Sequence, residues 1–257
     1  MNSKLTVKTA YANIYSDPQF SSQLVTQALF FETLEVISHH GNWFKVSQWD
    51  DYIGYIHKFY LFDDIADKEK KYVIKDRFLF LYDSIDFKNI TMVAPFGCKI
   101  PAILVDNNYY MIESDNKYFF KESSSIFKND KRSEIIECSK KLIGSPYLWG
   151  GKTPFGIDCS GFTQMVYKIN GYKLLRDAKD QATQGKTLSF IEESEPGDLA
   201  FFHNKEDVIV HVGIILKDNH IIHASGKVRI DRLDQTGIYN NEKNTHTHYL
   251  RYIKKII

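Results

Sequence analysis

The chain has 257 residues, a formal net charge of +1, 43% hydrophobic residues and 14% aromatic residues. This length suffices for one large domain or two to three small ones, each with a real core. The near-neutral charge, without a long run of one sign, argues against nucleic acid or an anionic membrane as partner, and no apolar segment approaches the length of a transmembrane helix.

The first 63 residues are predicted to form short strands separated by turns. Runs rich in β-branched and aromatic residues occur at 34–37, 43–46 and 53–56. His40-Gly41-Asn42 and Asp50-Asp51 supply turn chemistry between them. No helical period of useful length occurs, so residues 1–63 predict a small all-β barrel. The charged stretch 65–71 is expected to be a linker.

Residues 72–125 resemble a second copy of the first segment, displaced by sixty-six positions. Leu34 and Val36 are matched by Ile100 and Ala102, and residues 42–46 are matched by residues 108–112. A repeat of this period indicates two small domains rather than a solenoid. Both copies resemble bacterial SH3-like domains, and the first carries the better match. Residues 123–129 are expected to be a second linker.

From residue 130 onward the pattern changes to helices followed by strands. Asp130 can cap a helix whose apolar stripe includes Ile135, Cys138 and Leu142, and Gly144 can end it. Cys138 is expected to pack on that stripe. The next segment, residues 145–151, is an aromatic turn. It leads directly into a second helix.

The second helix is predicted to begin at a cysteine. Asp158 is a suitable N-cap and Gly171 a suitable C-terminal stop. Between them, apolar residues recur with the i, i+3, i+4, i+7 spacing of one helix face: Phe162, Met165, Val166 and Ile169. Cys159 then lies in the first turn, where free N–H groups and the helix dipole favour a thiolate, with pKa values as low as roughly 3.5–7.5. The alternative is a buried structural cysteine.

After this helix the chain turns to strands. Pro-Gly-Asp at 196–198 is a turn that enters a strand, and further strands are predicted at 211–216, 220–225 and 249–257. Residues 240–247 look like a polar loop, so His246 and His248 are expected to be solvated. Helices followed by an antiparallel meander make this part α+β.

A nucleophilic cysteine needs a base, and the base needs an orienting partner. A three-residue loop, 217–219, pairs Leu216 with His220. His211 and His223 are then diagonal neighbours on one face, about 7–8 Å apart by Cα. A two-residue loop would send His223 to the other face. We expect the three-residue loop, which brings the two histidines together.

A metal site built from His203, His211 and His223 is the weaker alternative, because no carboxylate or thiolate is suitably spaced. The chain has three cysteines: Cys98, Cys138 and Cys159. Their wide spacing matches neither a disulfide framework nor a zinc site. We therefore expect no metal, no cofactor and a reducing compartment. Residues 1–6 lack the features of a signal peptide, so the expected location is cytoplasmic, or periplasmic or secreted if a leader has been removed.

Six motifs of the last 128 residues occur in the order found in the NlpC-type cell-wall cysteine peptidases, and the resemblance covers about residues 130–257. They are Tyr147-Leu148-Trp149-Gly150-Gly151, Asp158-Cys159-Ser160-Gly161-Phe162, Arg176-Asp177 with Gln181, Pro196-Gly197-Asp198-Leu199, His211-Val212-Gly213-Ile214 and Ile222-His223-Ala224-Ser225. The resemblance implies a papain-like domain, with helices packed on an antiparallel sheet, behind two SH3-like barrels. It also implies that Cys159 is the nucleophile, His211 the general base and acid, and His223 the orienting residue. Tyr147 matches a tyrosine beside the nucleophile that helps to hold the oxyanion.

The SH3-like modules narrow the resemblance to γ-D-glutamyl-L-diamino-acid endopeptidases, which cut free murein peptides. In those enzymes the first module roofs a cleft that accepts a free N-terminal L-Ala. By this resemblance Asp158 and Ser160 match an ammonium-binding pair and Tyr52 matches a tyrosine of the roof. Asp17 matches an acidic partner there or is an ordinary turn aspartate, and Ala178 stands where many members have serine.

The expected partner is therefore a murein tripeptide-type substrate, L-Ala-γ-D-Glu-diamino acid, and we expect a monomer. Three alternatives remain open: a general peptidoglycan endopeptidase, a CHAP-like amidase that acts on intact wall, and a non-catalytic wall-binding protein.

Overall fold

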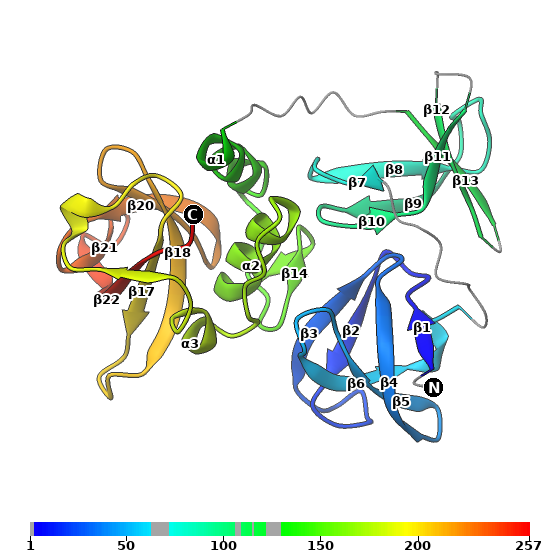
Figure 1. The fold of residues 1–257 in the computed structure, drawn as a ribbon, viewed down its shortest axis with the longest axis horizontal. Coiled ribbons are helices and arrows are strands. Elements are labelled where there is room, and N and C mark those ends of the chain that lie inside the picture. The colour runs from blue at the N-terminus through cyan, green and yellow to red at the C-terminus, as the bar shows by residue number, and fades with distance from the viewer. Residues whose placement is uncertain (1–2, 63–71, 106–108, 115, 122–129) are drawn as a thin grey trace. The chain divides into compact units, whose positions relative to one another are not determined.

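The computed structural model describes residues 3–62, 72–105, 109–114, 116–121 and 130–257. The linkers predicted at 65–71 and 123–129 lie outside the described residues, as does Asn108 of the repeat. The chain divides into two compact units, which we call unit 1 (Met1–Ile126) and unit 2 (Phe127–Ile257). Unit 1 is built from strands, and unit 2 combines helices with a larger sheet (Figure 1).

The first sheet of unit 1 is antiparallel, with the order β1-β4-β5-β6-β2-β3. Its strands are β1 (Lys4–Thr6), β2 (Tyr11–Tyr15), β3 (Leu24–Leu29), β4 (Thr33–His40), β5 (Trp43–Ser47) and β6 (Ile53–His57), followed by the 3-10 helix η1 (Lys58–Tyr60). Three of these coincide with the predicted runs. The predicted turns hold residues in the left-handed region, Gly41 with φ +63° and Asp51 with φ +67°.

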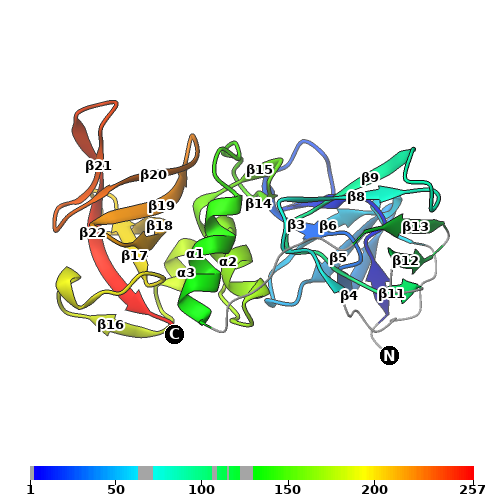
Figure 2. The ribbon, with the colours of Figure 1, turned by 90° about the horizontal axis from the view of Figure 1, so that it is seen from above.

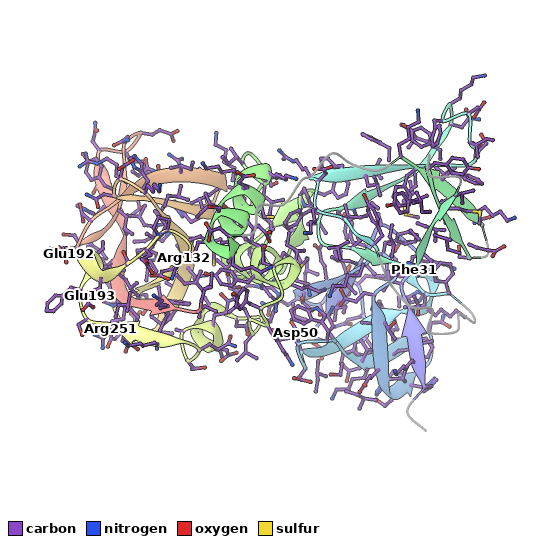
Figure 3. The ribbon with its side chains drawn as sticks, turned by 45° about the horizontal axis from the view of Figure 1, so that its top comes forward. Phe31, Asp50, Arg132, Glu192, Glu193 and Arg251 are labelled. Atoms are coloured by element: carbon purple, nitrogen blue, oxygen red, sulfur yellow. The ribbon has the colours of Figure 1, made fainter. Side chains whose placement is uncertain are left out.

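Alternating side chains of this sheet form its core. In β2, Ala12 and Ile14 are fully buried while their neighbours are only half-buried, which is the period of two that a strand requires. Both pack in one cluster with Leu34 and Val46. Phe31, labelled in Figure 3, is buried beside Phe30.

The rest of unit 1 forms two further sheets, one of two strands and one of five. The strands are β7 (Tyr72–Val73), β8 (Phe78–Tyr82), β9 (Ile90–Pro95), β10 (Lys99–Ile100), β11 (Ala102–Val105), β12 (Tyr109–Glu113) and β13 (Lys117–Phe120). The five-stranded sheet has the order β11-β12-β13-β8-β9. This is the order β4-β5-β6-β2-β3 of the first sheet with each strand replaced by its counterpart in the repeat. The sequence repeat therefore corresponds to a repeat of strand order.

Unit 2 begins with two helices of eleven residues, α1 (Lys131–Lys141) and α2 (Cys159–Ile169), with the short hairpin β14 (Lys152–Thr153) and β15 (Gly156–Ile157) between them. Asp130 caps α1 as predicted, because its side chain accepts hydrogen bonds from the backbone N–H groups of Arg132 and Ser133. Helix α2 contacts α1 on one side and strands of the large sheet on the other. The helices lie on one side of that sheet (Figure 2).

The large sheet of unit 2 closes on itself. Its order is β16-β22-β17-β18-β19-β20-β21, and β21 also pairs with β22. After α3 (Ala178–Gln181) its strands are β16 (Lys186–Leu188), β17 (Leu199–His203), β18 (Ile209–Leu216), β19 (His220–Ser225), β20 (Lys227–Leu233), β21 (Gly237–Asn240) and β22 (Thr245–Lys255), with the 3-10 helix η2 (Ile191–Glu193) before β17. The expectation of a polar loop over 240–247 is wrong for its last residues, because β22 begins at Thr245.

No helix within the described residues is long and apolar enough to cross a bilayer.

Candidate active site

Cys159 is the first residue of α2 and is buried, with 6% of its surface exposed. The Asp158 side chain caps the helix by accepting a hydrogen bond from the Gly161 backbone N–H at 2.6 Å. A Cβ on Gly161 would lie 2.2 Å from the Gly151 carbonyl oxygen, so glycine lets the first turn of the helix press against the preceding loop. The local sequence thus fixes the cysteine at a capped helix start.

The sulfur of Cys159 faces the large sheet. The backbone N–H groups of Val212, on β18, and of Ser160 lie near enough to the Cys159 sulfur to lower the pKa of its thiol. Val212 directly follows His211 in the strand. The helix start and the histidine strand therefore meet at the sulfur.

The two predicted histidines are hydrogen-bonded to each other. His211 Nε2 and His223 Nδ1 are 2.8 Å apart, and both side chains are buried. The hairpin register pairs Leu216 with His220, which confirms the predicted three-residue loop. Gly213 lies directly opposite His223, where an added Cβ would come within 2.9 Å of the His223 Cβ. A glycine in this place leaves room for the imidazole of His223.

A carboxylate that the sequence pattern did not reveal lies behind His223. His223 Nε2 lies 3.0 Å from Asp231 Oδ2, and Asp231 is 4% exposed. Asp231 is on β20, where the register pairs His223 with Arg229, so Asp231 is the diagonal neighbour of His223 on the same face. The short polar alternation around Ile230 was the signal that could have revealed this strand.

Arg229 holds this carboxylate from the other side. Arg229 Nη2 donates to Asp231 Oδ1 at 2.9 Å, and Arg229 Nε lies 2.8 Å from Asp231 Oδ2. Its remaining nitrogen, Nη1, donates to the exposed Glu242 at 3.0 Å. Burial alone would raise the pKa of Asp231, but the hydrogen bonds from His223 and Arg229 outweigh it and hold that pKa below its usual value.

The expectation that His246 and His248 are merely solvated is wrong. The His248 ring stacks on the His211 ring, with centroids 4.1 Å apart, and lies edge-on to His223 at 5.7 Å. His246 Nε2 instead lies within hydrogen-bond distance of Asp234 Oδ2, at 2.9 Å. The reason is the early start of β22, since the strand places His248 among the rings of its neighbours rather than in a loop.

Burial reverses the expected ionisation of the Cys159–His211 pair. Burial raises the pKa of the Cys159 thiol to about 12, and the negative charge of Asp158 adds to the effect. Burial also lowers the pKa of His211 well below its usual value, helped by His223 and His248. A helix N-terminus contributes typically 0.3–1 kcal/mol, whereas one pKa unit corresponds to about 1.4 kcal/mol, so the dipole cannot offset this desolvation. Burial therefore favours a neutral thiol and a neutral imidazole, the direction opposite to the predicted thiolate.

Tyr147 lies in the loop before β14 and is partly exposed. Burial raises the pKa of its hydroxyl to about 12, and the nearby Cys159 and Asp158 side chains act in the same direction. Its hydroxyl is therefore close to both groups and stays protonated at neutral pH. It is available as a hydrogen-bond donor beside the thiol.

Asp158 and Ser160 share one cation, Arg176. Arg176 donates to both Asp158 oxygens, at 3.0 Å and 2.7 Å, and also to Ser160 Oγ at 2.9 Å. Gly150 adds a backbone N–H to the same carboxylate at 2.8 Å. The negative charge of Asp158 is thus already paired with the buried guanidinium of Arg176. The sequence motif contained Arg176 but did not indicate this role.

Tyr52 and Asp17 belong to unit 1, whereas the other predicted site residues belong to unit 2. Tyr52 is half-buried in the turn before β6, where its backbone N–H donates to Asp50. Asp17 is exposed after β2 and accepts a hydrogen bond from Ser16 at 2.8 Å. Their assignment to substrate binding stays a prediction.

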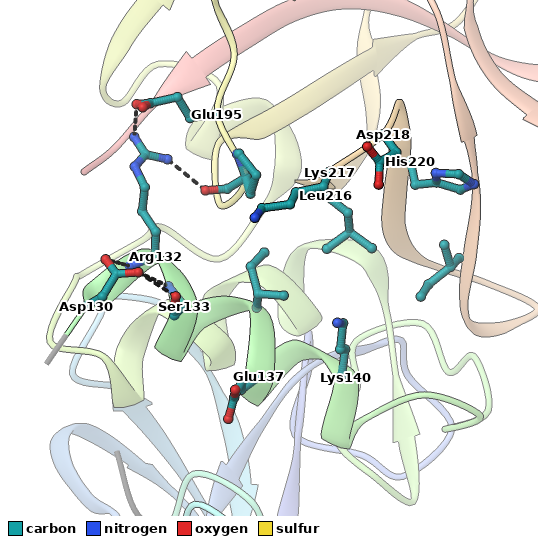
Figure 4. Close-up of a pocket in the computed structure, with 13 residues that line it drawn as sticks. Asp130, Arg132, Ser133, Glu137, Lys140, Glu195, Leu216, Lys217, Asp218 and His220 are labelled. Atoms are coloured by element: carbon teal, nitrogen blue, oxygen red, sulfur yellow. Dashed lines mark hydrogen bonds and ion pairs between the residues drawn. The ribbon is translucent and has the colours of Figure 1, made fainter. Parts of the chain in front are cut away.

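A separate pocket of about 680 Å³ lies between α1 and the β18–β19 hairpin (Figure 4). Its lining carries both signs of charge, and Arg132 in its wall is already paired with Glu195 and Asp198. None of the predicted site residues lines it. The pocket is therefore distinct from the cysteine site.

Comparisons with known proteins agree with this arrangement. The NlpC/P60 family matches residues 144–247, and the bacterial SH3 domain matches residues 10–62. The γ-D-glutamyl-L-lysine dipeptidyl-peptidase of Bacillus subtilis (strain 168) is 32% identical over 240 residues, covering 84% of this chain and 78% of that protein. Dipeptidyl-peptidase 6 of Lysinibacillus sphaericus is 26% identical, covering 87% of this chain and 89% of that protein.

Among solved structures, an NlpC/P60 family protein from Bacillus cereus ATCC 10987 has the same fold. Its TM-score is 0.83 at 21% identity, over 99% of each chain. Together with the extent of the match to the Bacillus subtilis enzyme, these similarities establish that the chain belongs to the NlpC/P60 family and carries a bacterial SH3 domain.

Proposed function

We propose that this protein is a cysteine peptidase that hydrolyses the γ-D-glutamyl-L-diamino-acid bond of murein peptides with a free N-terminal L-Ala, as a step in peptidoglycan peptide recycling. The observation that carries the proposal is the contact between His211 and His223 at 2.8 Å beside a helix-start cysteine. The similarity to the Bacillus subtilis γ-D-glutamyl-L-lysine dipeptidyl-peptidase and to the Lysinibacillus sphaericus dipeptidyl-peptidase 6 supports the substrate class.

The chemistry follows from the neutral resting pair. As Cys159 Sγ attacks the carbonyl carbon of the D-Glu γ-amide, its proton passes to His211, and the carbonyl oxygen becomes an oxyanion. The Cys159 backbone N–H and the protonated Tyr147 hydroxyl are the donors for that oxyanion. His211 then gives its proton to the departing amine, which leaves an acyl-enzyme thioester. Water, activated by His211, hydrolyses the thioester and frees the cysteine.

Recognition of the free N-terminus needs more groups than Asp158. Asp158 is neutralised by Arg176, so a substrate ammonium needs further acceptors. Ser160 supplies a hydroxyl near the nucleophile, and Tyr52 and Asp17 of the SH3-domain unit are proposed to complete the site. We also propose that the protein is monomeric and cytoplasmic. Residues 72–125 are proposed to form a second SH3-like module, which the repeated strand order supports.

Incubation with L-Ala-γ-D-Glu-L-Lys, followed by mass spectrometry, tests the proposal. The expected products are the dipeptide L-Ala-D-Glu and free lysine. Release of fragments from intact peptidoglycan, with no cleavage of the tripeptide, would favour the general wall hydrolase or the CHAP-like amidase. Binding to wall material without any cleavage would favour the non-catalytic alternative.

A further inference from the structure

Buried hydrogen bonds link His211, His223 and Asp231, and Asp231 determines which nitrogen of each histidine donates and which accepts. The chain of contacts runs from His211 Nε2 to His223 Nδ1 at 2.8 Å, and from His223 Nε2 to Asp231 Oδ2 at 3.0 Å. An imidazole nitrogen can donate or accept, but an ionised carboxylate can only accept. Among these three residues, Asp231 is therefore the one that, when ionised, can only accept a hydrogen bond.

Asp231 is held as an acceptor by Arg229. Two nitrogens of Arg229 face the carboxylate, at 2.9 Å and 2.8 Å, and a guanidinium can only donate. Both oxygens of Asp231 thus accept hydrogen bonds, Oδ1 from Arg229 and Oδ2 from His223. A protonated carboxylic acid in this position would direct its hydrogen at a donor, so the ionised form is the one that fits.

The remaining protons follow step by step. His223 Nε2 must carry a proton in order to donate to Asp231. In a neutral ring this leaves His223 Nδ1 as an acceptor, so His211 Nε2 must carry the proton between the two rings. The free lone pair of His211 is then on Nδ1. The reverse order would set an unprotonated His223 Nε2 against a carboxylate oxygen, two acceptors at 3.0 Å.

We propose that Asp231, held by Arg229, is a positioning residue that fixes the protonated nitrogens of His223 and His211 and so reserves His211 Nδ1 as the base for Cys159. The inference rests on the proposed peptidase function and adds a member to its site. When the thiol proton moves to His211 Nδ1, the resulting imidazolium still donates through Nε2 to His223. No proton leaves His223, and Asp231 stays ionised while it stabilises the positive charge through the intervening ring.

Nitrogen-15 NMR of histidine-labelled wild-type protein at neutral pH tests the order of protons directly. We expect neutral His211 and His223, each protonated at Nε2 and unprotonated at Nδ1. A proton on Nδ1 of either ring would overturn the inference. That result would leave the peptidase proposal intact, because the latter depends on cleavage of the tripeptide and on Cys159.

The variant Asp231→Asn adds a functional readout. Asparagine keeps the shape but offers one acceptor where the carboxylate offered two, so Arg229 and His223 compete for it. We expect mixed protonation at His211 by NMR and a fall in kcat of about 10–100-fold with KM unchanged. The matched control is Asp234→Asn, which alters a second His–Asp pair, that with His246, outside the site. It should leave kcat and the signals of His211 and His223 unchanged.

Unchanged kcat together with unchanged imidazole signals in folded Asp231→Asn would contradict a positioning role. If that variant fails to fold, the wild-type NMR spectrum still decides the question.

Discussion

His248 stacks on His211, with ring centroids 4.1 Å apart and the ring planes 28° from parallel. Burial lowers the pKa of His248 to about 4, and the neighbouring His223 adds to that effect. Unit 2 therefore contains three histidines, His211, His223 and His248, whose pKa values are lowered by burial so that the neutral forms are favoured. Protonation of these rings at acidic pH therefore opposes folding.

Unit 2 should become less stable as the pH falls from about 6.5 towards 4. In this window an unfolded His248, with an ordinary pKa of about 6.5, takes up a proton that the folded ring refuses, so acid favours the unfolded state. The loss from His248 alone is up to roughly 3 kcal/mol, and the other two rings act in the same direction. Urea unfolding at about pH 7 and pH 4.5 measures it. The variant His248→Phe keeps a stacked ring without a titrating group and should show a weaker pH dependence, whereas an unchanged dependence would contradict the assignment.

The thiol should react slowly with iodoacetamide at neutral pH. Because burial raises the pKa of Cys159 to about 12, its thiolate is scarce at pH 7. Alkylation of Cys159, followed by mass spectrometry of its peptide, should accelerate steadily as the pH rises through 8 to 10. A rate that is already at its plateau near pH 6 would instead reveal a thiolate–imidazolium pair in the resting enzyme.

Arg176→Ala should strongly destabilise the protein. Removal of the guanidinium leaves the carboxylate of Asp158 buried without its cation, which costs roughly 3–5 kcal/mol. The control is Arg251→Ala, which breaks an exposed ion pair with Asp207 and should cost at most about 1 kcal/mol. Urea midpoints of the two variants give the comparison, and equal losses would contradict the structural role of the buried pair.

N-acetylation of the substrate tests recognition of the free N-terminus. The acetyl group removes the positive charge and adds bulk at the alanine nitrogen, so kcat/KM should fall by at least two orders of magnitude, which is about 2.7 kcal/mol. L-Ala-γ-D-Glu-L-Lys and its N-acetylated form are compared under identical conditions. Equal rates would rule out a cleft closed around an ammonium and favour a general wall hydrolase.

Local sequence patterns predicted the features that depend on neighbouring residues. The i, i+3, i+4, i+7 spacing after Asp158 predicted α2, and the three-residue loop predicted that His211 and His223 share a face. What the sequence did not reveal depends on closure of the large sheet. Asp231 reaches His223 from β20, and His248 reaches His211 from β22, whose pairing with β21 closes the sheet.

The predicted thiolate at Cys159 disagrees with the structure for a related reason. A capped helix start is visible in the sequence and favours a thiolate, but the burial that opposes it is created by residues far along the chain. Strand β18, for example, packs against α2 from far along the chain. Desolvation of a group is a tertiary property, so a pattern around Cys159 cannot report it.

Turnover by Cys159→Ala tests the central claim most directly. The wild-type protein, incubated with L-Ala-γ-D-Glu-L-Lys, is expected to release lysine. Cys159→Ala should lose at least about 10⁴-fold in kcat, because it removes the sulfur that forms the acyl-enzyme. Its melting temperature should stay close to that of the wild type, since alanine is well tolerated at a helix start and the lost volume is small. Release of lysine by folded Cys159→Ala at a rate near that of the wild type would contradict the cysteine-peptidase account.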